Sequence, residues 1–148
     1  MMQTGIFTAY FPYGLDETAR KIRALGFNTV QLDMHFKDVD VSAGQITKDK
    51  CVRIRETFRD HDLPICCISG YTNIVHPDPA ERRKRVGYLK EIIRHAQYLG
   101  SPYVISETGT YNTESDWVAH PKNKTEEGFE ECREVIADLA PGLFNAVK

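Results

Sequence analysis

Apolar and polar positions follow two alternating patterns along the chain, one with the period of a strand and one with the period of a helix. Short runs of β-branched and aromatic residues predict four strands, at residues 4–11, 27–32, 65–69 and 103–106. Between them, apolar residues recur every three or four positions and predict four helices, at residues 16–25, 47–60, 78–99 and 125–140 with their caps included. This order predicts a parallel sheet, because parallel neighbours need a helical crossover.

The helix boundaries carry specific signals. Asp78-Pro79-Ala80-Glu81 offers an N-cap, a proline at the first helical position and, at the third, a reciprocal acid that is expected to bond back to the cap. Thr47 and Thr125 are predicted caps of the second and fourth helices. Pro141-Gly142 is the predicted stop of the last helix. The inward face of that helix is predicted to carry Phe129, Val135, Ile136 and Leu139.

The strand–helix units recur at roughly 37 residues, a plausible length for a βα repeat. A parallel series of this kind forms either an open doubly wound sheet or a barrel. Neither a Gly-x-Gly-x-x-Gly turn after the first strand nor a phosphate-binding Gly-x-x-x-x-Gly-Lys-Ser/Thr loop occurs, which disfavours dinucleotide and nucleoside triphosphate binding. In both architectures the carboxyl ends of the strands carry function.

Composition and charge narrow the class of protein. The chain has 148 residues, a net charge of −2 and 41% apolar residues, an ordinary globular composition that disfavours a nucleic-acid partner. No run approaches the roughly 18 apolar residues of a membrane span, and no signal peptide pattern opens the sequence. Four cysteines do not make a secreted disulfide scaffold. We therefore expect a cytoplasmic protein without a membrane partner.

The predicted strand ends gather polar and aromatic residues suited to a small polyol. Asp33 and His35 share one face of an extended segment, and either bind a divalent metal, act as an acid–base pair or cap a turn. Glu107 follows the fourth strand as a substrate ligand, a base or a solvated loop acid. His76 lies in the loop that enters the third helix, where a structural role is the simpler interpretation.

Two further motifs favour ordinary structural roles. Adjacent Cys66 and Cys67 are expected to point to opposite faces of the third strand and to pack in the core. Arg82-Arg83-Lys84-Arg85 forms a basic run on a helix, and its cations are expected to be solvated.

Two segments carry a resemblance to a known family: residues 76–82 (HPDPAER) before a long helix, and residues 96–104 (AQYLGSPYV) at a helix–Leu-Gly–strand junction. Together with the strand-tip layout, they resemble the sugar phosphate isomerase/epimerase family, the xylose-isomerase-like (β/α)8 barrels. The similarity extends to about Ala140. A complete barrel needs about 250 residues, so four units imply an α/β fold that is the (βα)4 half of a TIM barrel, one incomplete domain over residues 1–148.

The resemblance implies an enzyme that moves a proton beside a carbonyl of a sugar or sugar phosphate, helped by Mn, Mg or Zn. The family's main metal ligands follow the fifth to eighth strands, so no metal ligand is assigned here. By resemblance and position, His35 and Glu107 are the expected catalytic residues. The expected substrate-binding residues are Tyr10, Asp33, Cys66, Tyr71 and His76.

Residues 141–148 depart from the family pattern, and we expect a truncated product that lacks the main metal ligands. Two such halves are expected to pair as a homodimer through their open sheet edges. A non-catalytic sugar-binding or interaction module is the alternative. A relative of DNA-repair enzymes is disfavoured by the net charge and by the third strand ending in Ser69-Gly70 instead of a histidine.

Overall fold

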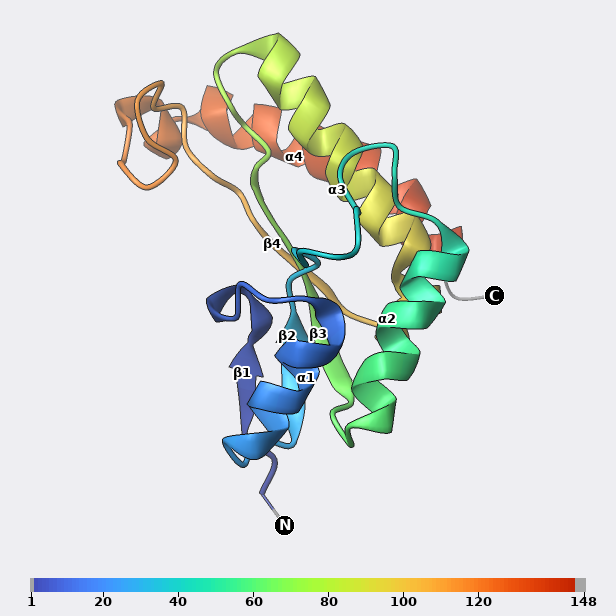
Figure 1. Cartoon of the computed structure of the whole chain (residues 1–148). Helices are drawn as coiled ribbons and strands as arrows, with labels where there is room; N and C mark the ends of the chain where they lie inside the picture. Colours follow the sequence, from blue (N-terminus) through green and yellow to red (C-terminus); the bar gives the residue numbers. More distant parts are fainter. Residues whose placement is uncertain (1, 146–148) are drawn as a thin grey trace. The chain divides into compact units, whose positions relative to one another are not determined.

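A computed structural model of the chain describes residues 2–145, and describes side chains for residues 2–139. Strands, α-helices and two short 3-10 helices (η) follow one another along the chain (Figure 1). Their bounds are β1 Gly5–Phe7, η1 Thr8–Tyr10, α1 Leu15–Ala24, β2 Thr29–Leu32, α2 Lys48–Asp60, β3 Ile65–Asn73, α3 Pro79–Leu99, β4 Val104–Glu107, η2 Pro121–Lys124 and α4 Glu126–Asn145.

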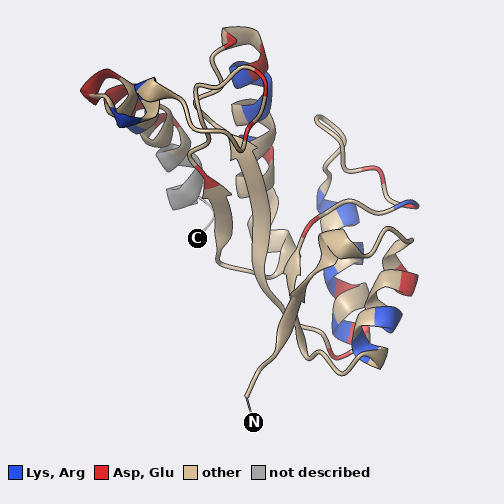
Figure 2. Ribbon diagram, turned by 90° about the vertical axis from the view of Figure 1, so that its left-hand side faces the viewer, with Lys and Arg blue, Asp and Glu red and all other residues tan. Residues whose placement is uncertain are grey.

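The strands form one sheet in the order β1-β2-β3-β4, so that each strand lies beside the next in sequence. The pairs β1–β2 and β2–β3 are parallel, with Phe7 opposite Gln31 and Leu32 opposite Ile68. Four parallel strands alternating with helices confirm the predicted (βα)4 arrangement. The four strands contain a single charged residue, Glu107, whereas the helices and loops carry the charge (Figure 2).

The chain divides into two compact units, which we describe separately. Unit 1 comprises the chain up to Gly70 together with His95–Ile105, and unit 2 comprises Tyr71–Arg94 and the chain from Ser106 onward. In unit 1 the core is built from β2 and the inner faces of α1 and α2, with Val30, Leu32, Ile22, Ile54 and Phe58 fully buried. In unit 2 the core residues come chiefly from α3 and include Val86, Leu89, Ile92 and Ile93.

The predicted caps are confirmed. Thr47 Oγ1 accepts the Lys50 N–H, Thr125 Oγ1 accepts the Gly128 N–H at 3.1 Å, and Asp78 Oδ1 accepts the Ala80 N–H at 2.7 Å. Backbone hydrogen bonds to Asp78, first of all the one from Ala80, lower the pKa of its carboxyl and so favour the charged form. Glu81 does not bond back to the cap but to Arg85, so the predicted reciprocal acid is wrong.

Three strands differ in length from the prediction, and of these the second begins at Thr29 instead of residue 27. The first strand ends at Phe7, because residues 8–10 turn into η1 and the Thr8 hydroxyl bonds the backbone of Asp33. The third strand continues to Asn73, because Gly70 is not among the glycines with positive φ and so does not turn the chain.

The last helix also departs from the prediction. The helical backbone of α4 continues through Pro141-Gly142 to Asn145, so the predicted stop is wrong. Proline fixes φ near a helical value, so a helix can continue through it, although it removes one backbone hydrogen bond and crowds the carbonyl four residues earlier. Leu139 is buried as predicted, but Phe129 and Ile136 are 61% and 48% exposed, because no described part of the chain covers their face. Residues 146–148 of the predicted tail lie outside the described residues.

The basic run on α3 is tied down by ion pairs within unit 2. Arg82 pairs with Glu131 of α4 at 3.6 Å, so that α3 and α4 lie side by side (Figure 1). Arg85 binds Glu81 at 3.0 Å, and Lys84 lies 3.6 Å from the same residue. Most of this run therefore meets acids of its own unit rather than solvent alone. None of the helices in the described chain is long and apolar enough to cross a membrane.

Candidate functional site

Asp33 and His35 form a hydrogen-bonded pair directly after β2. Asp33 Oδ1 accepts the backbone N–H of His35 at 3.0 Å and also contacts Nδ1 of the His35 ring. The His35 side chain is 80% exposed, whereas that of Asp33 is 19% exposed. The hydrogen bond from Asp33 raises the pKa of His35, which keeps the ring protonated to higher pH. The structure thus brings together two predicted site residues as a hydrogen-bonded pair, and the bond from the His35 N–H to Asp33 is the one that the turn-cap alternative predicts.

The backbone of Asp33 is fixed by Thr8, a residue that the sequence analysis assigned only to a strand. The buried Thr8 hydroxyl accepts the Asp33 N–H at 2.7 Å and donates to the Asp33 carbonyl oxygen at 2.9 Å. These two bonds join the end of β1 to the end of β2. Thr8 is therefore a positioning residue for the pair, and a hydroxyl at a strand end is the sequence signal that marks it.

A pocket of about 770 Å³ lies beside the pair in unit 1. It is lined by the segments that follow β1 and β2, with His35 and Tyr13 among the lining residues. Met34, Val39 and Val41 give it a buried apolar floor. Aromatic and apolar walls with a few polar groups are the usual lining of a small-molecule site.

The loop that forms the pocket wall is held by several bonds. The Lys37 N–H donates to the Tyr13 carbonyl oxygen at 3.1 Å, and Phe36 pairs with Val39 in an antiparallel bridge. Asp38 Oδ1 accepts the Leu15 N–H at 2.7 Å and so caps the first turn of α1. The wall is therefore built before any ligand binds, which lowers the entropic cost of binding.

The rim of this pocket carries a second acid that the sequence analysis did not single out. Asp40 Oδ1 accepts both the hydroxyl and the backbone N–H of Ser42, and these bonds lower the pKa of Asp40. Asp40 is thus an ionised acceptor for hydroxyl groups at neutral pH. The Asp-x-Asp-x-Ser pattern at residues 38–42, in a polar loop directly after a strand, is the signal that marks the rim.

Two predicted residues of unit 1 lie apart from the pocket lining. Tyr10, at the end of η1, is 76% exposed and stacks edge-on against Phe7 with ring centres 5.8 Å apart. Cys66 is the second residue of β3, and its thiol donates to the Val30 carbonyl oxygen at 3.2 Å. Tyr10 therefore follows β1 as predicted, whereas Cys66 lies near the amino end of its strand.

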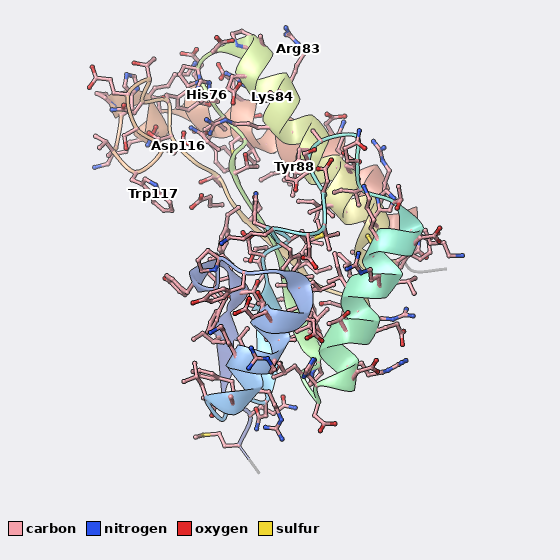
Figure 3. All side chains as sticks on the ribbon, in the orientation of Figure 1. His76, Arg83, Lys84, Tyr88, Asp116 and Trp117 are labelled. Carbon is pink, nitrogen blue, oxygen red and sulfur yellow. The ribbon has the colours of Figure 1, made fainter. Side chains whose placement is uncertain are left out.

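The other predicted residues belong to unit 2. Tyr71 lies within β3 and is 47% exposed, and Glu107 is the half-buried last residue of β4. His76 lies just before α3 (Figure 3), where its Nδ1 accepts the Asp78 N–H at 3.2 Å and its carbonyl oxygen accepts from Arg82. These bonds support the structural interpretation of His76.

Asn73 anchors the loop that follows β4 in unit 2. Its buried amide donates to the Thr110 carbonyl oxygen at 2.7 Å and to Asp116 Oδ1 at 3.0 Å. Its oxygen accepts the N–H groups of Val75 and Thr110. Asp116 also binds Arg85 at 2.5 Å, and that guanidinium, followed by the Asn73 amide, lowers the pKa of the Asp116 carboxyl. The polar groups of this network are used in holding the loop.

The same loop presents an aromatic side chain to solvent. Trp117 follows Asp116 directly (Figure 3) and is 82% exposed. An exposed indole on an anchored loop is a ready contact surface, because its flat face binds apolar C–H groups at little entropic cost. Trp117 was not predicted as a site residue, because it lies in a long polar stretch.

The described residues do not fit the metal centre that the family resemblance implies. No group of three or more His, Cys, Asp or Glu side chains gathers in the part of the chain that the structure describes. The Asp33–His35 pair offers two donors, but they bond to each other. We derive no step through a metal ion for these residues.

The sequence matches one family over most of its length. The matching family is described as the xylose isomerase-like TIM barrel, and the match covers residues 19–146. The chain belongs to this family. The match confirms the resemblance inferred from residues 76–82 and 96–104. No match was found among curated protein sequences.

Solved structures of similar fold include three sugar epimerases. A D-psicose 3-epimerase crystallised with D-fructose is 15% identical with a TM-score of 0.64, covering 98% of this chain and 50% of its own. The 3-keto-D-glucoside 4-epimerase YcjR from E. coli is 16% identical, with a TM-score of 0.62 and coverages of 99% and 52%. A D-psicose 3-epimerase with D-tagatose from Clostridium cellulolyticum H10 is 14% identical, with a TM-score of 0.61 and coverages of 98% and 50%.

These likenesses establish the fold. The chain spans about half the length of the structures that it matches, in agreement with a (βα)4 half of a barrel.

Proposed function

We propose that the chain forms part of an isomerase or epimerase that acts on a sugar or a sugar phosphate. The observation that carries this proposal is that His35, paired with Asp33, lies on the wall of a preformed pocket at the strand ends. Family membership and the sugar epimerases among similar structures support it.

The proposed chemistry is proton transfer next to a carbonyl group. A carboxylate base removes the proton on carbon, and an acid donates a proton to the carbonyl oxygen, which gives an enediol. In unit 1 we assign the acid to His35, whose pKa is raised by Asp33. Glu107, the last residue of β4 in unit 2, keeps the role of base that the family resemblance implies. Asp33 orients the imidazole ring and stabilises its protonated form.

The remaining assignments concern binding. Each unit offers exposed rings for the C–H face of a sugar, Tyr10 in unit 1 and Tyr71 and Trp117 in unit 2. His76 and Cys66 stay in the proposal as weaker substrate contacts, since each already bonds a backbone group.

The proposal also extends to cofactor and cellular place. A divalent cation is expected for full-length members of the family, and no ligand for it is assigned among the described residues of this chain. A cytoplasmic location rests on the composition. Calorimetry with and without Mn²⁺, with EDTA chelation as the control, tests whether this chain binds the cation by itself.

A pair of matched variants tests the role of His35 in the pocket. The unit holds a second histidine–carboxylate pair, His61 with Asp16 at 2.9 Å, which does not line the pocket. We expect His35→Asn to weaken binding of ketoses about tenfold, and His61→Asn to leave it unchanged. Calorimetry with a panel of ketoses and their phosphates measures both. Equal loss in the two variants contradicts the proposal.

Turnover separates the enzyme from its alternative, a non-catalytic sugar-binding or interaction module. Each ketose is incubated with the chain and the products are separated by chromatography. If the chain holds only half of the active site, the monomer is expected to bind ketoses with little turnover. Robust turnover by a monomer contradicts this expectation. Sugar binding that is independent of Mn²⁺, together with no turnover in any assembly state, favours the module.

We further propose that the chain self-associates through the edge of its sheet. β4 is an edge strand in the described sheet, and Tyr103 and Ile105 on and beside it are 66% and 39% exposed. Exposed edge strands with apolar side chains pair readily. Sedimentation velocity is expected to show a dimer that Ile105→Lys dissociates, and a concentration-independent monomer contradicts this proposal.

A further inference from the structure

The two adjacent thiols of β3 lie side by side, against the prediction that they point to opposite faces. Cys66 Sγ and Cys67 Sγ are 3.7 Å apart, although Cys66 is exposed and Cys67 is buried. The pairing of β2 with β3 shifts register at this point, so that Val30 faces Ile65 and Gln31 faces Cys67. Cys66 is thus the extra residue of a bulge, and bulges re-aim side chains.

A disulfide is a poor product for these two thiols. Adjacent Cα atoms are held about 3.8 Å apart by a trans peptide bond, below the about 4.4–6.8 Å span of an unstrained disulfide. A bridging atom relaxes this limit, because the sulfur atoms then stay apart. Two bonds of about 2.3 Å that span 3.7 Å meet at about 107°, an ordinary angle at a metal or metalloid centre.

The surroundings decide which kind of centre fits. Soft thiol ligands select soft, thiophilic centres. A tetrahedral zinc site needs further ligands, and the described residues gather no third His, Cys, Asp or Glu. A trivalent arsenic atom that carries one organic group has two bonds left for sulfur, which matches the two thiols available.

We propose that Cys66 and Cys67 form a two-sulfur binding site for trivalent organoarsenic compounds. For phenylarsine oxide, two S–H bonds and the As=O bond break, two As–S bonds form, and both thiol protons leave with the oxide oxygen as water. Arsenic stays trivalent, so no oxidant or reductant is consumed. Exposed Cys66 makes the first bond, and Cys67 closes the ring as an intramolecular step, which benefits from a high effective concentration.

The ionisation of the buried thiol sharpens the choice of reagent. Burial, and then the contact with Cys66, raise the pKa of Cys67 to about 11. Alkylation requires the thiolate and is therefore slow at Cys67. Closure of the arsenical ring is intramolecular and so compensates for the small thiolate fraction, whereas alkylation by iodoacetamide stays bimolecular. Cys67 is therefore expected to resist iodoacetamide and yet be captured by the arsenical.

The test is a titration of the native chain with phenylarsine oxide, followed by intact mass and by a count of the four thiols. We expect one adduct that consumes two thiols and is released by 2,3-dimercaptopropanol but not by an excess of 2-mercaptoethanol. Cys66→Ser is expected to weaken binding at least about 100-fold through loss of the chelate. Because Cys66 is exposed, this variant is expected to fold, and circular dichroism checks it.

Cys51→Ser and Cys132→Ser are the matched controls, and both are expected to keep the full affinity. Cys67→Ala provides a second variant that lacks the chelate, and it must lose affinity as Cys66→Ser does. Unchanged affinity in Cys66→Ser, release by the monothiol, or an adduct that maps to Cys51 or Cys132 each overturns the proposal. These readouts do not involve a sugar, so they are independent of the proposed function.

Discussion

Two polar networks lie at the ends of parallel strands in this chain. One leaves a side chain exposed to solvent, and the other bonds its polar groups within the fold. In unit 1, the buried Thr8 and the half-buried Asp33 hold His35, whose side chain is 80% exposed beside the pocket. In unit 2, Asn73 and Asp116 turn their polar atoms to Arg85 and to the backbone of the loop after β4. The first network leaves a titratable group free to meet a ligand, and the second uses its groups to fix a loop.

The comparison shows that position in the repeat does not by itself assign a role. Asn73 and His35 are both polar residues at strand ends, yet Asn73 is 1% exposed with each of its amide atoms bonded. What separates the two is where the hydrogen bonds go. A side chain with partners at every polar atom stabilises the fold, whereas an exposed one beside a pocket is available for chemistry.

The largest expected effect is the loss of the closed network. Asn73→Leu leaves the Val75 and Thr110 backbone groups unpaired in a buried site, so we expect a loss of about 3–5 kcal/mol in the free energy of unfolding. Urea unfolding measures this loss. Asn28→Leu is the control, because half-buried Asn28 accepts one bond, from the Thr4 N–H at 2.8 Å, and should cost under about 1 kcal/mol. An equal loss of unfolding free energy in Asn73→Leu and Asn28→Leu would contradict this prediction.

A smaller loss is expected in the open network. Thr8→Val keeps the shape of the side chain but removes both bonds to the Asp33 backbone, at an expected cost of about 1–3 kcal/mol. The control is Thr57→Val, which removes a single bond to the Arg53 carbonyl oxygen on α2. Thr8→Val should also change the His35 ring resonances in NMR spectra, and Thr57→Val should not. An unchanged His35 signal in Thr8→Val would refute the positioning role.

The ionisation of His35 provides a third test. Asp33→Asn removes the charged acceptor, so the pKa of His35 is expected to fall toward the about 6.5 of an unperturbed histidine. The raised pKa stabilises the folded chain at pH below the unfolded value, and this contribution is lost as the pH rises through the folded value. NMR titration of the ring measures the shift. An unchanged titration of His35 in Asp33→Asn would contradict this expectation.

The smallest effect is expected on the exposed rim. Ser42→Ala removes the hydroxyl bond to Asp40, so the pKa of that carboxyl should rise toward its ordinary value. The lowered pKa of the folded chain favours folding above the unfolded value and loses this effect as the pH falls. Carbon-detected NMR titration of Asp40 follows the change. A pKa that stays low in Ser42→Ala would mean that the backbone bond alone holds the carboxylate.

Much of the fold could be predicted because its signals are local. Thr47, Asp78 and Thr125 cap helices through atoms two or three residues away, so short sequence motifs suffice to find them. The missed features depend on distant partners. The first strand ends early because Thr8 bonds Asp33, 25 residues away, and no local pattern contains that information. Phe129 and Ile136 show that helical spacing predicts a face but not what covers it.

The candidate site shows the same division between local features, which were predicted, and distant contacts, which were not. Asp33 and His35 lie two residues apart, so their pairing follows from strand geometry. The pocket wall was not predictable, since its bonds join Lys37 to Tyr13 and Asp38 to Leu15 across a whole helix. The pairing of the Cys66 and Cys67 thiols was missed for another reason, because a register shift overrides the alternation of a regular strand.

The cap that Asp38 supplies to α1 couples the pocket wall to the helix behind it. Asp38 Oδ1 binds the Leu15 N–H at 2.7 Å, and the same residue lines the pocket. A ligand that draws this carboxylate toward its own hydroxyl groups would release the Leu15 amide, whereas one that packs against the wall would hold it more firmly. The hydrogen-exchange rate of one backbone amide, on a helix that never touches the ligand, would thus report how the pocket is occupied.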